Sequence, residues 1–246
     1  MALRVYLPPE TVQPPQAVLP PGVQHYLRVV LRLGPGAEFI AFDGSGRQWR
    51  LRLGEGATAE LLEDLPAHPE PPTAVTLYQG LPKGKRWPLI IQKCTELGVA
   101  RLVPVQSRHC VIRLGDCEAE AKRDRWQKIA TEAAEQSGGL RPPEVAGVMA
   151  WPTALAEWQA SGQPGLLLDE TLAASPDRGL RQALGDAAHQ RVAVFVGPEG
   201  GWSENERLSG REAGLRPVSL GGRILRAETA AIVVCALIRY ELGALG

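Results

Sequence analysis

Two segments of the chain combine residue types that could bind a ligand or take part in a reaction. The first is a glycine-rich loop, Gly197-Pro198-Glu199-Gly200-Gly201, which follows an apolar run of strand length at residues 192–196. Its glycines would let the backbone approach a ligand closely, because no Cβ atom stands in the way. The loop lacks the glycine patterns that bind nucleotide phosphates, and its carboxylate suits a cationic or neutral ligand better. A tight turn between a strand and a helix would explain the same residues.

The second segment, residues 220–229, places Arg223, Arg226 and Glu228 directly after another predicted strand. Side chains of these types can stabilise a developing charge or move a proton. A surface ion-pair cluster is the alternative interpretation, in which Glu228 interacts with the positive end of the last helix.

The elements that position these loops alternate along the second part of the chain. Apolar strands predicted at 74–78, 101–105, 165–168, 191–196 and 217–220 are separated by helices predicted at 87–97, 119–136, 204–213 and 228–242. Ser203 and Glu206 form a capping-box pattern at the start of the third helix. This alternation predicts an α/β fold with a parallel sheet covered on both faces. Because ligands bind beyond the carboxyl ends of such strands, we expect a site at the loops after Leu168, Val196 and Leu220.

The first part of the chain has a different pattern. Strands are predicted at 3–7, 38–42 and 48–53, with a hairpin turn at residues 43–46 and one helix at 24–31. His25, Arg28 and Arg32 recur at spacings that would place them on one face of that helix. Four prolines within residues 66–72 predict an extended connector. We therefore divide the chain into domains at 1–72 and 73–246.

The amino-acid composition of the chain argues against several classes of function. The 246 residues include 27 Lys and Arg against 27 Asp and Glu, so the net charge of zero excludes a globally basic nucleic-acid coat. The longest apolar run, at residues 230–238, is shorter than the roughly 20 residues of a membrane span. No secretory signal pattern is present at the N-terminus, so we expect a cytoplasmic protein without membrane association. Cysteines and histidines lack the paired spacing of a zinc site, so no metal cofactor is expected.

Together the two loops resemble the SPOUT class of methyltransferases. The stretches GPEGG with SENE, then LGGRILRAETA, resemble in particular the family that methylates N3 of a uridine in 16S ribosomal RNA of the small subunit. Residues 93–99 and 135–137 also match that family's pattern, as do residues 25–32 and 42–44 near the N-terminus. The resemblance covers essentially the whole chain.

The resemblance implies a fold and partners that spacing alone does not predict. It implies a SPOUT domain with a C-terminal trefoil knot, preceded by a small PUA-like β-barrel that binds RNA. It also implies S-adenosylmethionine as cofactor, a homodimer, and 16S ribosomal RNA or the small ribosomal subunit as substrate.

The resemblance also implies roles for individual residues. Arg226 would stabilise the anion that forms as uridine N3 loses its proton, and Glu228 would accept the proton or position another group. The residues expected to bind the cofactor are Leu168, Val196, Gly197, Pro198, Glu199, Gly200, Leu220, Gly221, Ile224, Leu225 and Thr229. Those expected to contact RNA are Arg4, His25, Arg28, Arg32, Lys83, Lys85, Arg86, Arg141 and Arg223.

Three other functions compete with this one. A SPOUT methyltransferase could act on transfer RNA or on another ribosomal RNA position. A non-catalytic RNA-binding protein could keep the same fold, although it would need neither the glycine-rich loop nor the Arg226–Glu228 pair. A nicotinamide-dependent oxidoreductase would fit the α/β architecture, but the chain lacks the G-x-G-x-x-G pattern.

Overall fold

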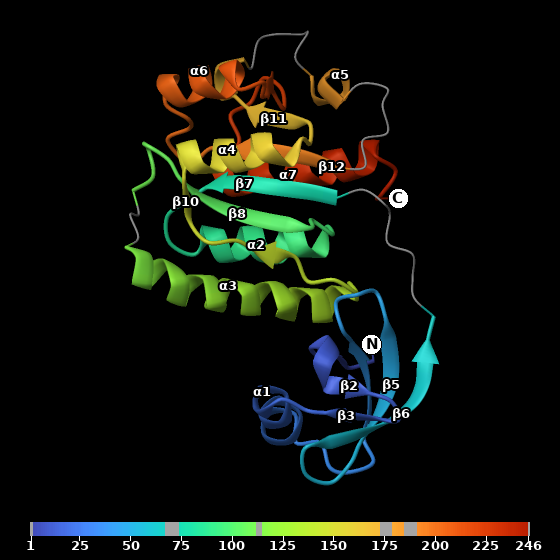
Figure 1. Cartoon of the computed structure of the whole chain (residues 1–246). Coiled ribbons are helices and arrows are strands. Elements are labelled where there is room, and N and C mark those ends of the chain that lie inside the picture. Colours follow the sequence, from blue (N-terminus) through green and yellow to red (C-terminus); the bar gives the residue numbers. More distant parts are fainter. Residues whose placement is uncertain (1, 67–73, 112–114, 173–178, 185–190, 246) are drawn as a thin grey trace. The chain divides into compact units, whose positions relative to one another are not determined.

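The computed structural model describes residues 2–66, 74–111, 115–172, 179–184 and 191–245 of the chain. The chain forms two compact units (Figure 1). The first contains Met1–Glu70 and Ala134–Pro142, and the second contains Pro71–Ala133 and Pro143–Gly246. Most of the predicted proline connector, at 67–72, lies outside the described residues.

The first unit is built around a six-stranded sheet with the strand order β1-β4-β5-β6-β3-β2. These strands are β1 (Arg4–Tyr6), β2 (Val12–Gln13), β3 (Gln16–Val18), β4 (Glu38–Phe42), β5 (Gln48–Leu53) and β6 (Thr58–Leu65). β1 pairs with β4 in parallel, and the other neighbours are antiparallel. In β5 the apolar Trp49, Leu51 and Leu53 are buried while the two arginines between them are exposed, as expected for a sheet with one solvated face.

The helical segment of the first unit differs from the prediction. It consists of α1 (Pro21–His25) and a π-helical turn, η2 (Tyr26–Val30), after the short 3-10 helix η1 (Pro9–Thr11). The chain leaves the helix at Leu31, and Arg32 adopts a left-handed conformation with φ of 57°. Arg32 therefore does not share a helical face with His25 and Arg28, and that prediction was wrong.

The first unit also includes the last turn of a long helix, α3 (Asp116–Ser137), and the residues that follow it. Glu135 accepts a hydrogen bond from the backbone N–H of Tyr6 at 2.8 Å. Phe42 packs with Ala134 and Leu140 in a small apolar cluster. These contacts join a segment to the first unit that no sequence pattern connected with it.

The second unit contains a seven-stranded sheet in which every described pair is parallel, as predicted. The strand order is β10-β8-β7-β12-β11-β13, and β9 pairs with β8. The strands are β7 (Ala74–Gly80), β8 (Arg101–Gln106), β9 (Glu144–Val145), β10 (Met149–Ala150), β11 (Gly165–Leu168), β12 (Arg191–Val196) and β13 (Arg216–Val218). Because all of them run in one direction, their carboxyl ends lie at one edge of the sheet.

Helices cover both faces of this sheet and fill two separate apolar cores. One core combines Val192, Val194 and Val196 of β12 with α2 (Arg86–Glu96), α3, α5 (Leu180–Leu184) and α7 (Ala227–Glu241). The other combines Ala193 and Phe195 with α4 (Trp151–Ser161) and with Trp202, which precedes α6 (Glu204–Glu212). The alternation along β12 thus assigns successive side chains to opposite faces.

Gly165 shows how tightly the second core is packed. A Cβ atom at this position would lie 2.5 Å from Cδ2 of Leu215 and would clash with the indole ring of Trp158. We expect Gly165→Ala to destabilise the protein by about 1–3 kcal/mol, because extra atoms in a packed core force side chains away from their preferred rotamers. The midpoint of urea unfolding, with its slope, measures this change.

Gly147→Ala is the matched control, because nothing lies within 4 Å of a Cβ atom at that position. We expect its free energy of unfolding to stay within about 0.5 kcal/mol of the wild-type value. Equal stability of the two variants would contradict the packing argument.

Candidate functional site

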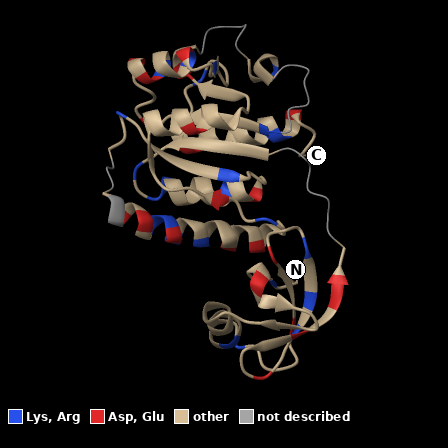
Figure 2. Ribbon diagram, in the orientation of Figure 1, with Lys and Arg blue, Asp and Glu red and all other residues tan. Residues whose placement is uncertain are grey.

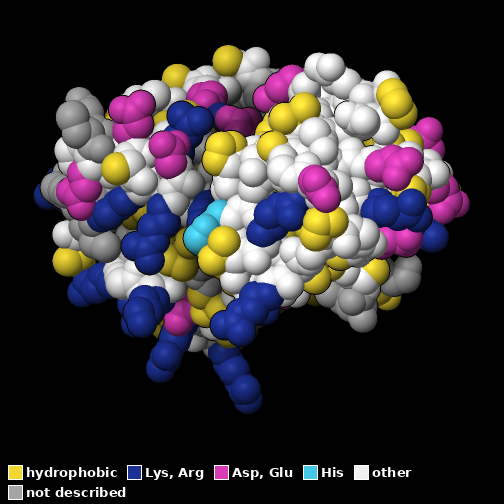
Figure 3. All heavy atoms as spheres, turned by 90° about the horizontal axis from the view of Figure 1, so that it is seen from below, with side chains coloured by type: hydrophobic (Ala, Val, Ile, Leu, Met, Phe, Trp, Pro, Cys, Tyr) yellow, Lys and Arg dark blue, Asp and Glu magenta, His cyan; other side chains and the backbone are white. Residues whose placement is uncertain are grey.

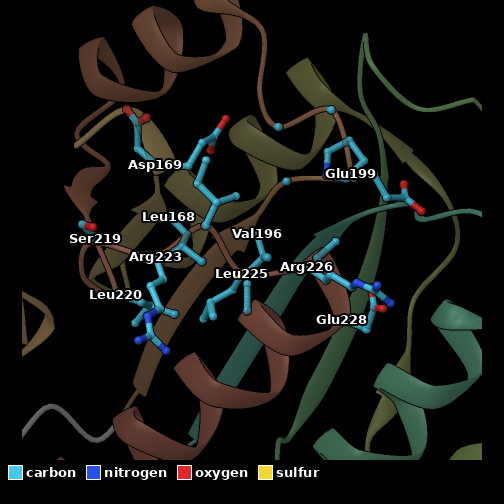
Figure 4. A pocket seen from close by; sticks show the side chains of 18 of the residues that line it. Leu168, Asp169, Val196, Glu199, Ser219, Leu220, Arg223, Leu225, Arg226 and Glu228 are labelled. Carbon is cyan, nitrogen blue, oxygen red and sulfur yellow. The ribbon is translucent and has the colours of Figure 1, made fainter. Parts of the chain in front are cut away.

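A cavity of about 650 Å³ lies at the carboxyl ends of β11, β12 and β13 (Figure 4). Its walls come from the segments after Leu168, Val196 and Val218 and from the start of α7. The lining residues are Arg86, Leu168, Asp169, Glu170, Val196, Gly197, Pro198, Glu199, Gly200, Gly201, Ser219, Leu220, Gly221, Arg223, Ile224, Leu225, Arg226, Ala227, Glu228 and Ala230. The three loops that the sequence analysis singled out therefore converge on one space.

Most of the residues expected at a cofactor site line this cavity, as do Arg226 and Glu228. Thr229 is exposed on α7 and does not line it. Arg86 and Arg223, expected to contact RNA, are among its walls. Four lining residues lie outside the two segments that the sequence indicated and were not expected at the site: Asp169, Glu170, Ser219 and Ala230.

Residues 197–201, here called the glycine loop, depend on the small size of their glycines. A Cβ atom at Gly197 would lie 3.1 Å from the Gly201 backbone, and one at Gly201 would clash with the Glu170 carboxylate. Gly201 also has a φ of 64°, which residues with side chains rarely adopt. The predicted capping box follows: the Ser203 N–H donates to Oε2 of Glu206 at 2.8 Å, and the Glu206 N–H donates to Oγ of Ser203.

The end of β7 packs against the glycine loop. The side-chain amide of Gln79, which is fully buried, donates to the Gly197 carbonyl at 3.0 Å. A Cβ atom at Gly80 would lie 2.6 Å from the Pro198 nitrogen, so only glycine allows this approach. Neither residue stood out in the sequence, because a glutamine and a glycine at the end of an apolar strand have no distinctive pattern.

Glu199 lies on the side of the glycine loop that faces the start of α2. Its Oε1 accepts the Lys83 backbone N–H at 2.8 Å and Nη1 of Arg86 at 2.5 Å. Partial burial opposes ionisation of Glu199, but the Lys83 N–H and the Arg86 guanidinium outweigh it and hold the pKa of this carboxyl below its usual range. Glu199 is therefore an ionised carboxylate whose charge is shared with Arg86.

Arg86 also interacts with Glu228, in the first turn of α7. Its Nε lies 3.5 Å from Oε2 of Glu228, whose side chain is 14% exposed. The ion-pair alternative for this segment is thus partly right, but the partner of Glu228 is an arginine at the start of α2. Arg226, which precedes the helix, is exposed, and its side chain forms no hydrogen bond or ion pair with the described residues.

The side chains of the second segment lie on different sides of the cavity. Figure 4 shows Arg226 and Glu228 next to each other, while Arg223 points away on the opposite side. Ile224, between these arginines, lines the cavity although its side chain is 82% exposed. A cation and an apolar side chain are thus both accessible to a ligand in this space.

Asp169 holds the loop that follows β11. Its side chain is fully buried and accepts hydrogen bonds from the Thr171 hydroxyl at 2.6 Å and from Nη2 of Arg211 at 2.6 Å. A carboxylate bound in this way fixes the backbone beside Leu168. Its position directly after an apolar strand was a signal that the sequence analysis did not use.

The arginines expected to bind RNA from the first unit fall into two groups. Arg28 donates to the carbonyls of Gly54 at 2.6 Å and Gly56 at 2.7 Å. Arg4 donates to Gln48, stacks on Phe42 and has two buried guanidinium nitrogens. Arg141 donates to the Ser45 carbonyl at 2.8 Å. His25, Arg32 and Arg141 are exposed, whereas Arg4 and Arg28 are partly buried.

The described part of the chain contains no group of histidine, cysteine, aspartate and glutamate side chains that could hold a metal ion. None of its helices combines the length and apolar character needed to cross a membrane.

Several known proteins resemble this chain in sequence and in structure. A model of the RNA methyltransferase domain matches residues 69–239. The ribosomal RNA small subunit methyltransferase E of Synechocystis is 38% identical, over 98% of this chain and 78% of that protein. The protein of the same name from Bacillus subtilis is 31% identical, over 88% of this chain and 87% of that one.

Two solved structures resemble the whole chain. The ribosomal RNA small subunit methyltransferase E of Neisseria gonorrhoeae, bound to S-adenosyl methionine, aligns with a TM-score of 0.84 at 34% identity and covers 98% of both chains. A methyltransferase of Legionella pneumophila with bound SAM aligns with a TM-score of 0.87 at 28% identity, again over 98% of both chains. By its sequence and its fold, the chain belongs to the RNA methyltransferase family that includes the ribosomal RNA small subunit methyltransferases E.

Proposed function

We propose that this protein uses S-adenosylmethionine to methylate N3 of a uridine in 16S ribosomal RNA of the small subunit. The observation that carries the proposal is the cavity at the ends of β11, β12 and β13, in a chain that belongs to this methyltransferase family. A relative with 34% identity over the whole chain binds S-adenosyl methionine. Because small ribosomal subunits are in the cytoplasm, we infer that the protein acts there.

The cavity residues fit this cofactor in size and charge. A volume of about 650 Å³ lies within the range of roughly 300–1,000 Å³ that is usual for sites of small molecules. S-adenosylmethionine carries a sulfonium and an ammonium, and Glu170, whose side chain is exposed, is among the residues that line the cavity. The glycine loop would hold the adenine through its backbone, and Leu168, Val196, Leu220 and Leu225 would supply apolar contacts.

When bound, the cofactor supplies an electrophilic methyl group on a sulfonium. This chain's residues must then stabilise the uridine as N3 loses its proton and negative charge spreads onto the uracil oxygens. Arg226 suits that role, because its exposed guanidinium is beside the cavity and forms no ion pair with the described residues. Glu228, next to Arg226 at the cavity wall, would accept the proton that leaves N3 or position the group that accepts it.

The same proposal includes four further features. They are the trefoil knot, the PUA-like character of the first unit, the domains at 1–72 and 73–246, and the homodimer. The likeness over 98% of both chains to the Neisseria enzyme supports a shared fold.

The experiment that tests the function is transfer of a labelled methyl group to unmodified small ribosomal subunits. We expect label on one nucleotide of 16S ribosomal RNA, at N3 of a uridine, as mapped by nuclease digestion and mass spectrometry. Naked 16S ribosomal RNA and transfer RNA are the comparison substrates. Label on transfer RNA alone, or at another atom of the base, would contradict the proposal.

The role of Arg226 is tested by replacing it. We expect Arg226→Ala to lower turnover by about 10²–10³-fold, the usual cost of removing one donor to a developing anion. The dissociation constant for S-adenosylmethionine should change less than about threefold, because the loss concerns the transition state. Arg226→Lys keeps the charge and should retain more activity than alanine. Unchanged turnover in the alanine variant would remove Arg226 from the mechanism.

Arg28 and Arg32 should behave differently, although the sequence treats them alike. We expect Arg32→Ala to weaken RNA binding and to flatten its salt dependence, because Arg32 is exposed. We expect Arg28→Ala mainly to lower the melting temperature, because its guanidinium binds the Gly54 and Gly56 carbonyls. Filter binding at several salt concentrations and thermal unfolding measure the two effects, and equal behaviour of the variants would contradict this distinction.

A further inference from the structure

Two further loops lie at the edge of the sheet that carries the cavity. Residues 81–85 follow β7, and residues 107–110 follow β8. In the sheet, β7 lies between β8 and β12, and all three strands are parallel. The loops after β7 and β8 are therefore next to the glycine loop, and basic residues occur in both of them (Figure 2).

Both loops touch the glycine loop directly. The Lys83 backbone N–H donates to Glu199, and Nδ1 of His109 lies 2.9 Å from the Gly200 carbonyl and 3.3 Å from that of Gly201. A Cβ atom at Gly200 would lie 3.0 Å from Cβ of His109. These contacts fix the positions of both loops relative to the cavity wall.

The turn at residues 107–110 is held rigidly by its own buried residues. Ser107 and Cys110 are 2% and 6% exposed, and their side chains lie 3.2 Å apart. The Cys110 N–H donates to the Ser107 carbonyl, and the Arg108 N–H donates to Oε1 of Glu206 at 2.8 Å. Between these anchors, the side chains of Arg108 and His109 are exposed.

The exposed cations of these two loops have no partners within the described residues. The side chains of Lys83, Lys85 and Arg108 form no hydrogen bond or ion pair there. In contrast, many other basic side chains of the second unit form ion pairs, such as Arg101 with Glu157 and Arg211 with Asp169. We call Lys83, Lys85 and Arg108 the cationic rim, which His109 connects to the glycine loop.

We propose that the cationic rim binds backbone phosphates of the RNA next to the target nucleotide, with Arg108 as its central contact. The inference rests on the proposed function and extends it by two residues, Arg108 and His109, that the sequence did not indicate. Phosphate contacts orient an RNA without reading its sequence. A guanidinium on a fixed turn, linked through His109 to the glycine loop, would set the distance between the RNA backbone and the cavity.

The test compares Arg108→Gln with Arg125→Gln. Arg125 is also exposed, lies on α3 in the second unit, and has no partner among the described residues, but α3 carries alternating acidic and basic residues (Figure 2). Binding of each full-length variant to unmethylated 16S ribosomal RNA is measured by filter binding across a range of salt concentrations. Binding of S-adenosylmethionine is measured separately by calorimetry.

For Arg108→Gln we expect the dissociation constant for RNA to rise about five- to tenfold. The slope of its logarithm against the logarithm of salt should fall by roughly 0.7–0.9, the value for one lost phosphate contact. The dissociation constant for S-adenosylmethionine should stay the same, and Arg125→Gln should change neither constant.

Three outcomes would overturn the inference: an unchanged RNA constant and slope in Arg108→Gln, an equal loss in Arg125→Gln, or a loss of cofactor affinity without a loss of RNA affinity. The proposed function fails separately, if the wild-type protein binds both ligands but transfers no methyl group. Because the rim is tested by binding alone, the two failures are distinguishable.

Discussion

Arg86 joins the parts of the cavity that come from different elements. Its guanidinium lies between Glu199 of the glycine loop and Glu228 of α7, while its backbone begins α2. This cation thus links two segments that are far apart in the sequence, and its hydrogen bond helps to hold the pKa of Glu199 below its usual range. The pairing also determines which arginine can interact with a ligand. Arg86 forms ion pairs with the two carboxylates, whereas the side chain of Arg226 is exposed.

The cavity depends equally on the direction of the strands. A parallel sheet brings the segments after β11, β12 and β13 to one edge, although they are far apart in the sequence. The glycine loop can lie close to β7 because Gly80 has no side chain and because Gln79 binds the Gly197 carbonyl. Backbone groups are thereby held in place before any ligand arrives, which reduces the entropy lost on binding.

The sequence predicted the strands that have a clear hydrophobic pattern and missed those that lack one. The predicted bounds of β4, β5, β11 and β12 agree with the structure, because these strands have clear alternation or continuous apolar runs. Strands β2, β3, β9 and β10 were missed, since segments of two or three residues have no period, and β6 was missed because its apolar and polar residues do not alternate regularly. Helix α4 was also missed: it begins with Trp151 and Pro152, and three of its apolar residues are alanines. Residues Ala134–Pro142 belong to the first unit through long-range contacts, such as the hydrogen bond between Glu135 and Tyr6. A local sequence pattern cannot predict contacts of this kind.

The sequence also indicated charged residues of the site without indicating how they pair. The sequence identified Glu199, Arg226 and Glu228 as neighbours of a ligand loop, and the structure brings them to one cavity. It did not show that Arg86 would pair with both glutamates, or that Arg28 would bind backbone carbonyls. A basic residue in a sequence is only a candidate for binding RNA, because its charge can be used within the protein. Figure 3 shows many exposed Lys and Arg side chains, yet their number says little about affinity for RNA. A protein with zero net charge can bind a polyanion where cations without internal partners are grouped and held in place, as they are at the cationic rim.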